Sequence, residues 1–572
     1  MAKKKLAHKL LSAMLSLLSH GRRPPLSRAP AAAAAAQQGP QPQPSRPVVH
    51  HNATPPAAGT TTANTTTTLV VDVDTALLLS GGDLFPYFML VALEAGGFLR
   101  GLVLLLLYPL VLCLTSRSAA VKLMAAAAFC GLRASRFRAG RAVLPKWFMD
   151  DVAAEAFEAA RAAAAPARWA CVTAMPRVMV EGFLREYMGV DTVVAPEMKV
   201  VWGFYTGLME EGGDHEQVFM AAAAAEEEAG RKKTEDGDVL GFAGSLEFLN
   251  HPLSHCCKEV YVVSPEERSR WRALPRGKYP KPMVFHDGRL AFRPTAADTA
   301  AMFAWLPFGA ALGAARLAVA LTVPYRYSTP ILAATGMSWR LKGARPPLPG
   351  AGDGGRSRGQ LFVCNHRTLI DPVYVSVALD RQVRAVSYSL SRLSELISPI
   401  GRTVRLTRDR GSDGAVMARL LDGGDLVVVC PEGTTCREPY LLRFSPLFAE
   451  LSDDVVPVGI AVETSMFYAT TAGGLKCFDP LYYMINPRMC YTVQFLDKVD
   501  TSPARGGAAP STDMANLVQR KMGDALGYGC TMLTRKDKYL MLAGNDGIVR
   551  TEDKSGAGAG AGKKTKSKRK ND

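Results

Sequence analysis

Three short apolar runs in the second half of the chain restrict its fold more than any other feature. They are Leu361–Cys364, Leu426–Cys430 and Val455–Val462. Runs of this length are typical of buried strands, and helical patterns lie between them. This alternation predicts an α/β domain over residues 331–550. In open α/β sheets functional residues gather where strands end, so the loops after these runs are the places to examine.

The first run leads into a loop that contains His366 and Asp371. Residues five apart do not share a helix face, so the two side chains meet only if the chain turns before a helix begins. Asp371 followed by Pro372 is typical of a helix N-cap with proline at the first helical position. A carboxylate that holds an imidazole in one tautomer makes it a general base. The alternative is a plain cap beside an ordinary loop histidine.

The second run leads into Pro-Glu-Gly-Thr at residues 431–434, with Arg437 shortly after. A glycine turn after a strand exposes backbone N–H groups, and threonine and arginine side chains complete a cradle for phosphate or carboxylate. Arg405, Arg408 and Arg410 lie between the two motifs and are candidates for further anion contacts. Taken singly these signals are weak, because glycine turns are common and arginine runs are usually solvated.

The first half has a second strand-end pattern. Order is expected to begin at Leu69, where a Leu-Val-Val run leads into Asp72 and Asp74, and a strand at residues 168–172 ends at Thr173. We expect one domain over residues 69–297. One interpretation of these two carboxylates is that they are ordinary polar residues at a strand end.

Two apolar stretches are candidates for membrane helices. Residues 85–116 include an uncharged segment, 101–116, which is 16 residues long and shorter than the roughly 20 that cross a bilayer. It is either a membrane helix or a buried or interfacial one. Residues 299–325 are 27 residues with one charge, Arg316, and are the best transmembrane candidate.

Charge separates the body of the chain from its ends. The net charge is +16, but residues 1–71 hold eight basic and no acidic residues and residues 555–572 hold six basic and one acidic residue, so the ends carry +13. A nearly neutral body disfavours a broad basic face for nucleic acid. We therefore expect no nucleic-acid partner. The eleven cysteines are scattered without paired CxxC groups, which disfavours a disulfide scaffold or zinc site.

Four motifs, taken in order, resemble the four blocks of the glycerolipid acyltransferases. They are His366-x4-Asp371, the arginine segment at 405–410, Pro-Glu-Gly-Thr at 431–434 and the strand Val-Pro-Val at 456–458. Further segments resemble the land-plant glycerol-3-phosphate acyltransferases that make cutin, suberin and pollen-wall precursors. They are Phe-Pro-Tyr-Phe at 85–88, Phe-His-Asp-Gly-Arg at 285–289, Trp-Leu-Pro-Phe-Gly at 305–309, Cys-Arg-Glu-Pro at 436–439 and Arg-Lys-Asp-Lys-Tyr at 535–539. The resemblance covers residues 69–550.

The resemblance implies a mechanism and its residues. His366 would deprotonate a hydroxyl of glycerol-3-phosphate, which attacks an acyl-CoA, while Asp371 orients the imidazole; no metal or cofactor is needed. The product would be lysophosphatidic acid, acylated at sn-2 by analogy. The expected substrate-binding residues are Arg405, Arg408, Glu432, Gly433, Thr434 and Arg437. The alternatives are a bifunctional acyltransferase and phosphatase giving monoacylglycerol, and an inactive membrane scaffold.

The family's N-terminal region is similar to haloacid-dehalogenase (HAD) phosphatases, which implies a Rossmann-like α/β domain. Asp72, Asp74 and Thr173 match the phosphatase motifs, but Ala76 replaces the expected threonine or valine. The segment expected to hold magnesium-binding carboxylates reads Gly-Ser-Leu-Glu-Phe-Leu-Asn at 244–250. The resemblance therefore implies a degenerate phosphatase domain with little or no activity.

The ends of the chain indicate two different locations. Residues 1–68 are predicted to be a disordered basic extension or a mitochondrial or plastid transit peptide. Residues 551–572 are predicted to be a disordered basic tail, and its lysines at positions 568 and 570 resemble the KxKxx retrieval signal of endoplasmic-reticulum membrane proteins. A generic lysine-rich tail is the alternative. We expect an integral membrane enzyme of the endoplasmic reticulum, since both substrates are cytosolic.

Overall fold

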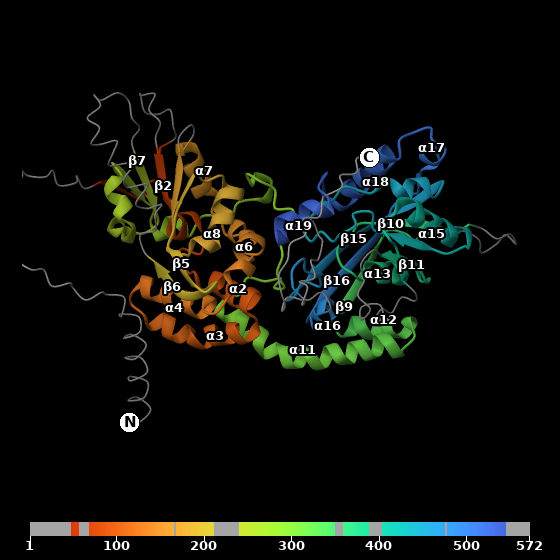
Figure 1. Cartoon of the computed structure of the whole chain (residues 1–572), viewed down its shortest axis with the longest axis horizontal. Coiled ribbons are helices and arrows are strands. Elements are labelled where there is room, and N and C mark those ends of the chain that lie inside the picture. Colours follow the sequence, from red (N-terminus) through yellow and green to blue (C-terminus); the bar gives the residue numbers. More distant parts are fainter. Residues whose placement is uncertain are drawn as a thin grey trace, which may run out of the picture. The chain divides into compact units, whose positions relative to one another are not determined.

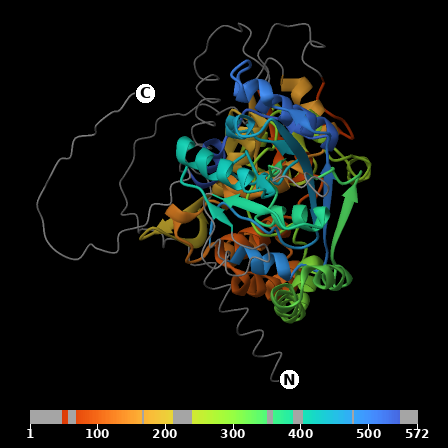
Figure 2. The same cartoon turned by 90° about the vertical axis from the view of Figure 1, so that its right-hand side faces the viewer.

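The computed structural model describes residues 47–56, 68–164, 168–210, 239–348, 358–387, 403–474 and 478–544. Two large β-sheets organise these residues, one in each half of the chain (Figures 1 and 2). The predicted basic tail, residues 551–572, lies outside the described residues.

The first sheet is parallel throughout. In the described residues it has six strands in the order β1-β8-β7-β2-β3-β4. Their bounds are β1 (Val48–His51), β2 (Thr68–Asp72), β3 (Trp169–Val172), β4 (Thr192–Val194), β7 (Val239–Ala243) and β8 (Glu259–Val262). Because β2 and β3 are neighbours and point the same way, Asp72 and Thr173 leave the sheet at the same edge. The strand expected at residues 168–172 is confirmed.

Strand β1 corrects the expectation that residues 1–68 are disordered throughout. Val48 to His51 pair in register with Glu259 to Val262 of β8. The Val-Val pair has high strand propensity, and the edge of β8 offers free backbone groups to pair with. A single short strand surrounded by low-complexity sequence gives too weak a periodic signal to be found from sequence.

Helices flank the first sheet. They are α2 (Phe85–Gly96), α3 (Phe98–Cys113), α4 (Arg117–Phe129), α5 (Ala139–Ala142), α6 (Leu144–Met149), α7 (Ala154–Ala164), α8 (Arg177–Phe183) and α10 (Pro265–Arg268), with a hairpin of β5 (Glu197–Val201) and β6 (Phe204–Glu210). Gly97, at φ 88°, separates α2 from α3. Most of α2 is buried, whereas only Gly101, Leu104 and Val111 of α3 are. The apolar segment 85–116 is therefore two helices with different surroundings.

The second sheet is mixed. Within the described part of the chain its order is β12-β11-β13-β10-β15-β16-β9, and β17 pairs with the start of β15. The bounds are β9 (Met337–Lys342), β10 (Leu361–Cys364), β11 (Arg384–Ser387), β12 (Val404–Arg405), β13 (Val427–Val429), β15 (Asp454–Thr464), β16 (Met489–Phe495) and β17 (Val499–Asp500). The three strands expected from the apolar runs are confirmed as β10, β13 and β15. They are parallel neighbours, with β10 in the middle.

The remaining elements cover this sheet and close its loops. They are α12 (Tyr325–Ala334), α13 (Asp371–Leu379), α15 (Arg410–Asp422), α16 (Asp479–Met484), α17 (Ser502–Arg505), α18 (Ser511–Leu526) and α19 (Arg535–Ala543), with a small pair of β14 (Tyr440–Leu441) and β18 (Gly529–Cys530). Helix α18 buries an apolar stripe of Ala515, Val518 and Met522 against the sheet. Loops gather at the ends of β10 and the strands beside it.

Helix α11 (Ala296–Thr322) joins the two halves. Among the described helices it is the one long and apolar enough to cross a membrane, a weak criterion when met once. Trp305, Gly309, Gly313 and Arg316 lie on one face of it. Trp305 donates to Ile485 O (2.8 Å), and the buried Arg316 donates to Met484 O (2.6 Å) and Asn486 O (2.7 Å). That face therefore packs against residues 484–486 of the second half.

Candidate active site

His366 and Asp371 face each other at the carboxyl end of β10. Nδ1 of His366 lies 2.9 Å from Oδ2 of Asp371. An ionised carboxylate only accepts hydrogen bonds, so the neutral imidazole carries its proton on Nδ1 and its Nε2 is the basic nitrogen. The side chain of His366 is 18% exposed and that of Asp371 is fully buried. The pair thus has one end sealed in protein and the other close to solvent.

Asp371 also holds the loop that precedes it. Its carboxylate accepts from the backbone N of Arg367 (2.6 Å), the backbone N of Thr368 (2.9 Å) and Oγ1 of Thr368 (2.9 Å). The expected N-cap role is wrong, because Ile370 is the N-cap and Asp371 is the first residue of α13. The carboxylate turns back toward the loop, away from the helix amides. Two residues five apart meet through this turn.

The backbone of His366 is fixed by the neighbouring strands. The side chain of Asn365 donates to Ile460 O of β15 (2.9 Å) and accepts from Ile460 N (2.7 Å). The backbone N of Cys436, in the loop after β13, donates to His366 O (2.8 Å). These bonds tie the loop to β15 and to the loop after β13, so the backbone that carries the imidazole is held rigidly.

Glu432 holds the backbone of His366 through its carboxylate. Its carboxylate accepts from the backbone N of His366 (2.9 Å) and of Leu442 (3.2 Å). Burial raises the pKa of Glu432 to about 7, although these donors oppose the rise. Both oxygens are engaged with the protein, so the structure gives Glu432 a bracing contact, and its expected contact with substrate stays a prediction.

The rest of the Pro-Glu-Gly-Thr loop is braced by α19. Gly433 adopts φ 66° and is exposed, which leaves its backbone open to solvent. Nζ of the buried Lys538 donates to Thr435 O (2.5 Å) and Oγ1 (3.0 Å), and lies 3.4 Å from Oγ1 of Thr434. The motif at 535–539 was noted from sequence only as part of the family resemblance, and no role was predicted for Lys538. A lysine inside a short motif near the C-terminal end was the available signal.

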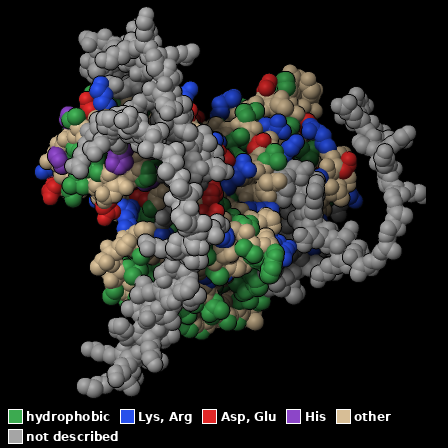
Figure 3. All heavy atoms as spheres, turned by 60° about the vertical axis from the view of Figure 1, so that its left-hand side comes forward, with side chains coloured by type: hydrophobic (Ala, Val, Ile, Leu, Met, Phe, Trp, Pro, Cys, Tyr) green, Lys and Arg blue, Asp and Glu red, His purple; other side chains and the backbone are tan. Residues whose placement is uncertain are grey.

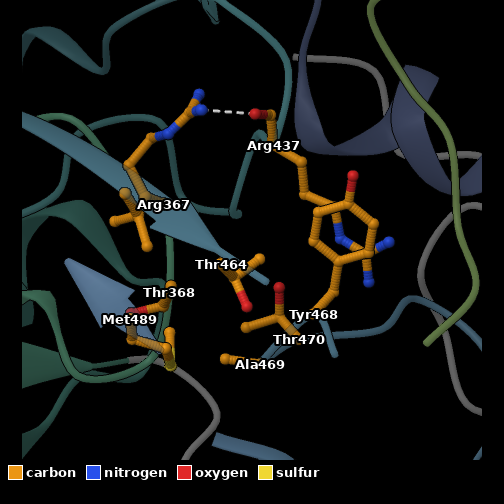
Figure 4. Close-up of a pocket in the computed structure, with 9 residues that line it drawn as sticks. Arg367, Thr368, Arg437, Thr464, Tyr468, Ala469, Thr470 and Met489 are labelled. Atoms are coloured by element: carbon orange, nitrogen blue, oxygen red, sulfur yellow. Dashed lines mark hydrogen bonds between the residues drawn. The ribbon is translucent and has the colours of Figure 1, made fainter. Parts of the chain in front are cut away.

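A small cavity lies beside the pair (Figure 4). It is lined by Arg367, Thr368, Arg437, Val462, Thr464, Tyr468, Ala469, Thr470 and Met489. Its volume is about 30 Å³, room for a water molecule or two. Thr368 connects it to the pair through Asp371. A larger ligand enters only if side chains move.

Two arginines reach this cavity in different ways. Arg367 donates from Nη1 to Glu438 O (2.6 Å) and from Nη2 to Arg437 O, the bond drawn in Figure 4, so it ties two loops together. Arg437 lies over the ring of Tyr468, 4.3 Å from its centroid. Burial lowers the pKa of Arg437, and Asp287 opposes this. Arg367, inside the His-x4-Asp spacing, was missed from sequence although it follows His366 directly.

Arg405 and Arg408 are placed elsewhere. Both are exposed and neither lines the cavity. Arg405 ends the edge strand β12, three positions from β10 in the sheet, which is about 14 Å at usual strand spacing. Arg410, the third member of that run, pairs with Glu450. The structure thus does not bring these arginines to the cavity, because proximity in sequence order does not fix position across a sheet.

The surroundings of His366 favour its protonated form. Burial alone would lower the pKa of His366, but the neighbouring Cys430 and the hydrogen bond to Asp371 outweigh burial and raise the pKa well above its ordinary value. Cys430 itself lies against Cys364, with the sulfur atoms 3.2 Å apart. An imidazole with a raised pKa is a stronger base once it has lost its proton.

The phosphatase-like strand end has its own cluster. Asp72 accepts from Oγ1 of Thr75 and from the backbone N of Asp74 (3.0 Å). Asp74 accepts from Oγ1 of Thr173 (2.5 Å) and lies 3.3 Å from Nη2 of Arg117. Burial, with Asp74 next to it, raises the pKa of Asp72 to about 6, and burial also raises that of Asp74. The structure therefore brings the three predicted residues, Asp72, Asp74 and Thr173, together. It also places Arg117, which was not predicted, beside Asp74.

The segment 244–250 does not reach this cluster with carboxylates. A side chain at Gly244 would meet Thr75 O at 2.0 Å, so glycine is required for the close approach. Ser245 caps a short turn by accepting from the backbone N of Glu247 (3.2 Å). Glu247 and Asn250 are exposed. The turn thus packs the backbone closely and directs its only acid toward solvent.

Comparison with known proteins agrees with both halves. Residues 68–263 match the family model described as glycerol-3-phosphate acyltransferase RAM2-like, HAD-like domain, and residues 350–461 match the acyltransferase model. A probable glycerol-3-phosphate acyltransferase 3 of Arabidopsis thaliana is 49% identical over 84% of this chain and 91% of its own length. Glycerol-3-phosphate acyltransferase RAM2 of Petunia hybrida is 41% identical over 83% of this chain and 97% of its own length. The chain belongs to the glycerol-3-phosphate acyltransferase family.

In this acyltransferase the HAD-like domain does not fit magnesium. Its fold implies a divalent cation held by several carboxylates. The described residues contain no group of three or more His, Cys, Asp or Glu side chains that could hold a metal ion. Nη2 of Arg117 lies 3.3 Å from Oδ2 of Asp74 and brings a positive charge to the two carboxylates. With a guanidinium in that place and no third acid beside the pair among the described residues, we derive no phosphoryl chemistry at this site.

Proposed function

We propose that this glycerol-3-phosphate acyltransferase transfers an acyl group from acyl-CoA to a hydroxyl of glycerol-3-phosphate and releases lysophosphatidic acid. The 2.9 Å contact between Nδ1 of His366 and Asp371 carries the proposal, because it makes Nε2 the basic nitrogen of the neutral ring. The family to which the chain belongs supports the choice of acceptor.

The reaction needs no covalent enzyme intermediate. Nε2 of His366 takes the proton of the attacking hydroxyl, the new C–O bond forms at the thioester carbonyl, and the C–S bond breaks. The imidazolium then returns the proton to the departing CoA thiolate. Asp371 stabilises the imidazolium by charge and holds the ring in place. No metal or cofactor takes part in this sequence.

Arg437 is the residue that we assign to the phosphate of glycerol-3-phosphate. It is buried, it lines the cavity beside the pair, and a guanidinium suits a phosphate because it offers paired donors. Gly433 and Thr434 border the same loop and are proposed to contact the glycerol phosphate through the backbone and the hydroxyl. Arg405 and Arg408 keep at most an indirect part, since neither lines the cavity.

Product and pathway are finer proposals that rest on family resemblance. We propose sn-2 acylation for extracellular lipid polyester such as cutin, suberin or the pollen wall. The poor fit of the HAD-like site to magnesium supports lysophosphatidic acid over monoacylglycerol as the product.

We further propose that the enzyme is membrane-bound through α3 and α11. These helices are in contact, and they expose Leu99 (77%), Leu106 (71%) and Phe308 (70%). Figure 3 shows hydrophobic side chains gathered along this side of the molecule. The opposite face of α11 is held by Met484 and Asn486, which favours a helix lying in the membrane interface over one that crosses.

The endoplasmic reticulum is the proposed membrane. The lysines at 568 and 570 support it by their resemblance to a retrieval signal. Imaging the chain tagged separately at each end tests this, and a mitochondrial pattern with a free N-terminus would overturn it.

His366→Ala in a microsomal acyl-transfer assay tests the central proposal. We expect a loss of about 10²- to 10⁴-fold, which is the usual contribution of a general base. His255→Ala, at an exposed histidine of the HAD-like half, is the matched control and should keep full activity. Wild-type activity in His366→Ala would rule out His366 as the base.

A further inference from the structure

The segment that follows the HAD-like domain forms part of the wall of the acyltransferase cavity. The backbone N of Tyr468 donates to Arg289 O (2.7 Å), and the backbone N of Ala291 donates to Met466 O (2.9 Å). Residues 289–291 thus run beside residues 466–468 like a short added strand. The cavity-lining residues Tyr468, Ala469 and Thr470 depend on this pairing for their position.

Asp287 fastens the far end of the same loop. Its buried carboxylate accepts from Oγ1 of Thr471 (2.8 Å), the backbone N of Ala472 (2.9 Å) and the backbone N of Gly473 (2.8 Å). Three donors within one loop fix the direction of the carboxylate. Asp287 is thus a rigid negative charge at the edge of the cavity.

The same carboxylate faces Arg437. Oδ1 of Asp287 lies 3.7 Å from Nη2 of Arg437, close enough for attraction but too far for a hydrogen bond. Among the described residues neither Nη1 nor Nη2 of Arg437 has a hydrogen-bond acceptor, although both are buried and the side chain is only 9% exposed. Buried donors without partners are costly, so these two await an acceptor.

We propose that Asp287 is a positioning residue of the acyltransferase reaction, which turns Arg437 so that its free donors meet the phosphate of glycerol-3-phosphate. This inference rests on the assignment of Arg437 to that phosphate. Asp287 orients the guanidinium by charge without using its donors, and the ring of Tyr468 lies against the guanidinium (Figure 4).

The proposal gives the segment between the two matched domains a role in acyl transfer. Asp287 lies between the stretches matched by the two family models, 68–263 and 350–461. The adjacent His286 contacts Glu438 through Nε2 at 2.9 Å, and Arg276 pairs with the same carboxylate. The segment therefore contacts two successive residues of this loop, Arg437 and Glu438.

Removing the charge of Asp287 changes phosphate binding in opposite directions for the two roles that Asp287 could have, positioning Arg437 or balancing its charge. Removing a negative charge beside an arginine makes the cavity more positive, so a purely electrostatic role predicts tighter phosphate binding. Positioning predicts weaker binding, because the guanidinium loses its orientation. The KM for glycerol-3-phosphate reports the difference.

Asp287→Asn in the full-length chain is the test, with acyl-CoA saturating and glycerol-3-phosphate varied. We expect KM for glycerol-3-phosphate to rise roughly tenfold, the scale of one well-placed charge-assisted hydrogen bond, with kcat changed less than about threefold. In an Arg437→Ala background Asp287→Asn should add nothing further, since it acts through Arg437. Asp151→Asn is the control, a buried carboxylate whose partners Arg293 and Tyr87 do not line the cavity.

The outcomes are distinguishable. If Arg437→Ala leaves KM for glycerol-3-phosphate unchanged, the phosphate assignment itself fails. If Arg437→Ala raises that KM and Asp287→Asn leaves it unchanged or lowers it, the positioning role is overturned. Should Asp287→Asn not fold, Thr471→Val removes one of the donors that fix the carboxylate, and it should raise KM about threefold. An unchanged KM in that variant counts against the proposal.

Discussion

The two halves of the molecule hold a buried carboxylate in nearly the same way, yet only one of them presents a base. Asp371 accepts from backbone amides, a threonine hydroxyl and His366. Asp74 accepts from the backbone N of Ala174 and the hydroxyl of Thr173, and it faces Arg117. Both lie at the carboxyl ends of parallel strands. The difference is the basic partner.

That difference teaches how a strand-end carboxylate acquires a function. A histidine changes its charge near neutral pH and moves a proton, whereas an arginine stays charged at any physiological pH. The same carboxylate therefore activates a base in one half and closes an ion pair in the other. The predictions below are ways to break this contrast or sharpen it.

The largest effect is expected from Asp371→Asn. Acyl transfer should fall by on the order of 10²-fold or more, because the imidazole loses its orientation and its charge partner. A base must be neutral to act, so wild-type kcat/KM should fall as pH drops through the raised pKa of His366, above the usual value of about 6.5. Without Asp371 that pKa falls, and the acid limb of the pH profile should move to lower pH.

Asp413→Asn is the matched control for that prediction. Asp413 is buried and accepts from the backbone N and Oγ1 of Thr407 and from the backbone N of Arg408, a similar pattern without a histidine. It should lose stability but keep the acid limb in place. An acid limb that stays put in Asp371→Asn as well would show that His366 is not the titrating group, and Glu432, whose pKa is about 7, would be the next candidate.

An intermediate effect is expected from Arg117→Ala. The buried carboxylates of Asp72 and Asp74 lose their counter-charge, so the free energy of unfolding should fall by about 1 to 3 kcal/mol, the lower part of the range for broken buried pairs because Arg117 is partly exposed. Adding Asp74→Asn should recover most of the loss. Urea unfolding measures both, and Arg161→Ala, at an exposed arginine of α7, is the control. Equal stability of Arg117→Ala and wild type would contradict the ion-pair role.

The smallest effect is expected from magnesium. A ligand at 100 times its Kd stabilises a protein by about 2.7 kcal/mol, so a functional HAD site would raise Tm clearly. We expect Tm to be unchanged by millimolar Mg²⁺ or EDTA, and no inorganic phosphate to appear when the enzyme consumes glycerol-3-phosphate and acyl-CoA. Phosphate release with accumulating monoacylglycerol would show that Arg117 does not close the site.

Local patterns were readable where they were strong and short-ranged. The runs that became β10, β13 and β15 are apolar and bounded by polar sequence, so their identity follows from burial alone. The spacing of His366 and Asp371 allowed contact only through a turn, and the structure has that turn. Strand β1 was missed because four residues carry little periodic signal.

Relations across the fold were not readable. Arg405 and Arg408 precede the Pro-Glu-Gly-Thr motif in sequence but lie at the end of the edge strand β12 and shortly after it, whereas Arg367 and Arg437 come to the cavity from loops beside β10 and β13. Which arginines share a cavity depends on strand order. Strand order is set by long-range pairing, which single residues do not encode.

The sequence by itself determined that this chain has two α/β halves, a His-Asp pair after a buried strand, and a phosphatase-like half without its usual carboxylates. The α/β pattern of the second half and the His-Asp spacing rest on local chemistry, namely periodicity, spacing and residue type, whereas the phosphatase-like half and its missing carboxylates rest on the resemblance to a known family. Only the tertiary structure decided that Glu432 braces the loop, that Arg117 stands opposite Asp74, and that Asp287 reaches Arg437 from between the two domains. Each of these contacts joins residues from separate elements, and packing alone brings them within a few ångströms.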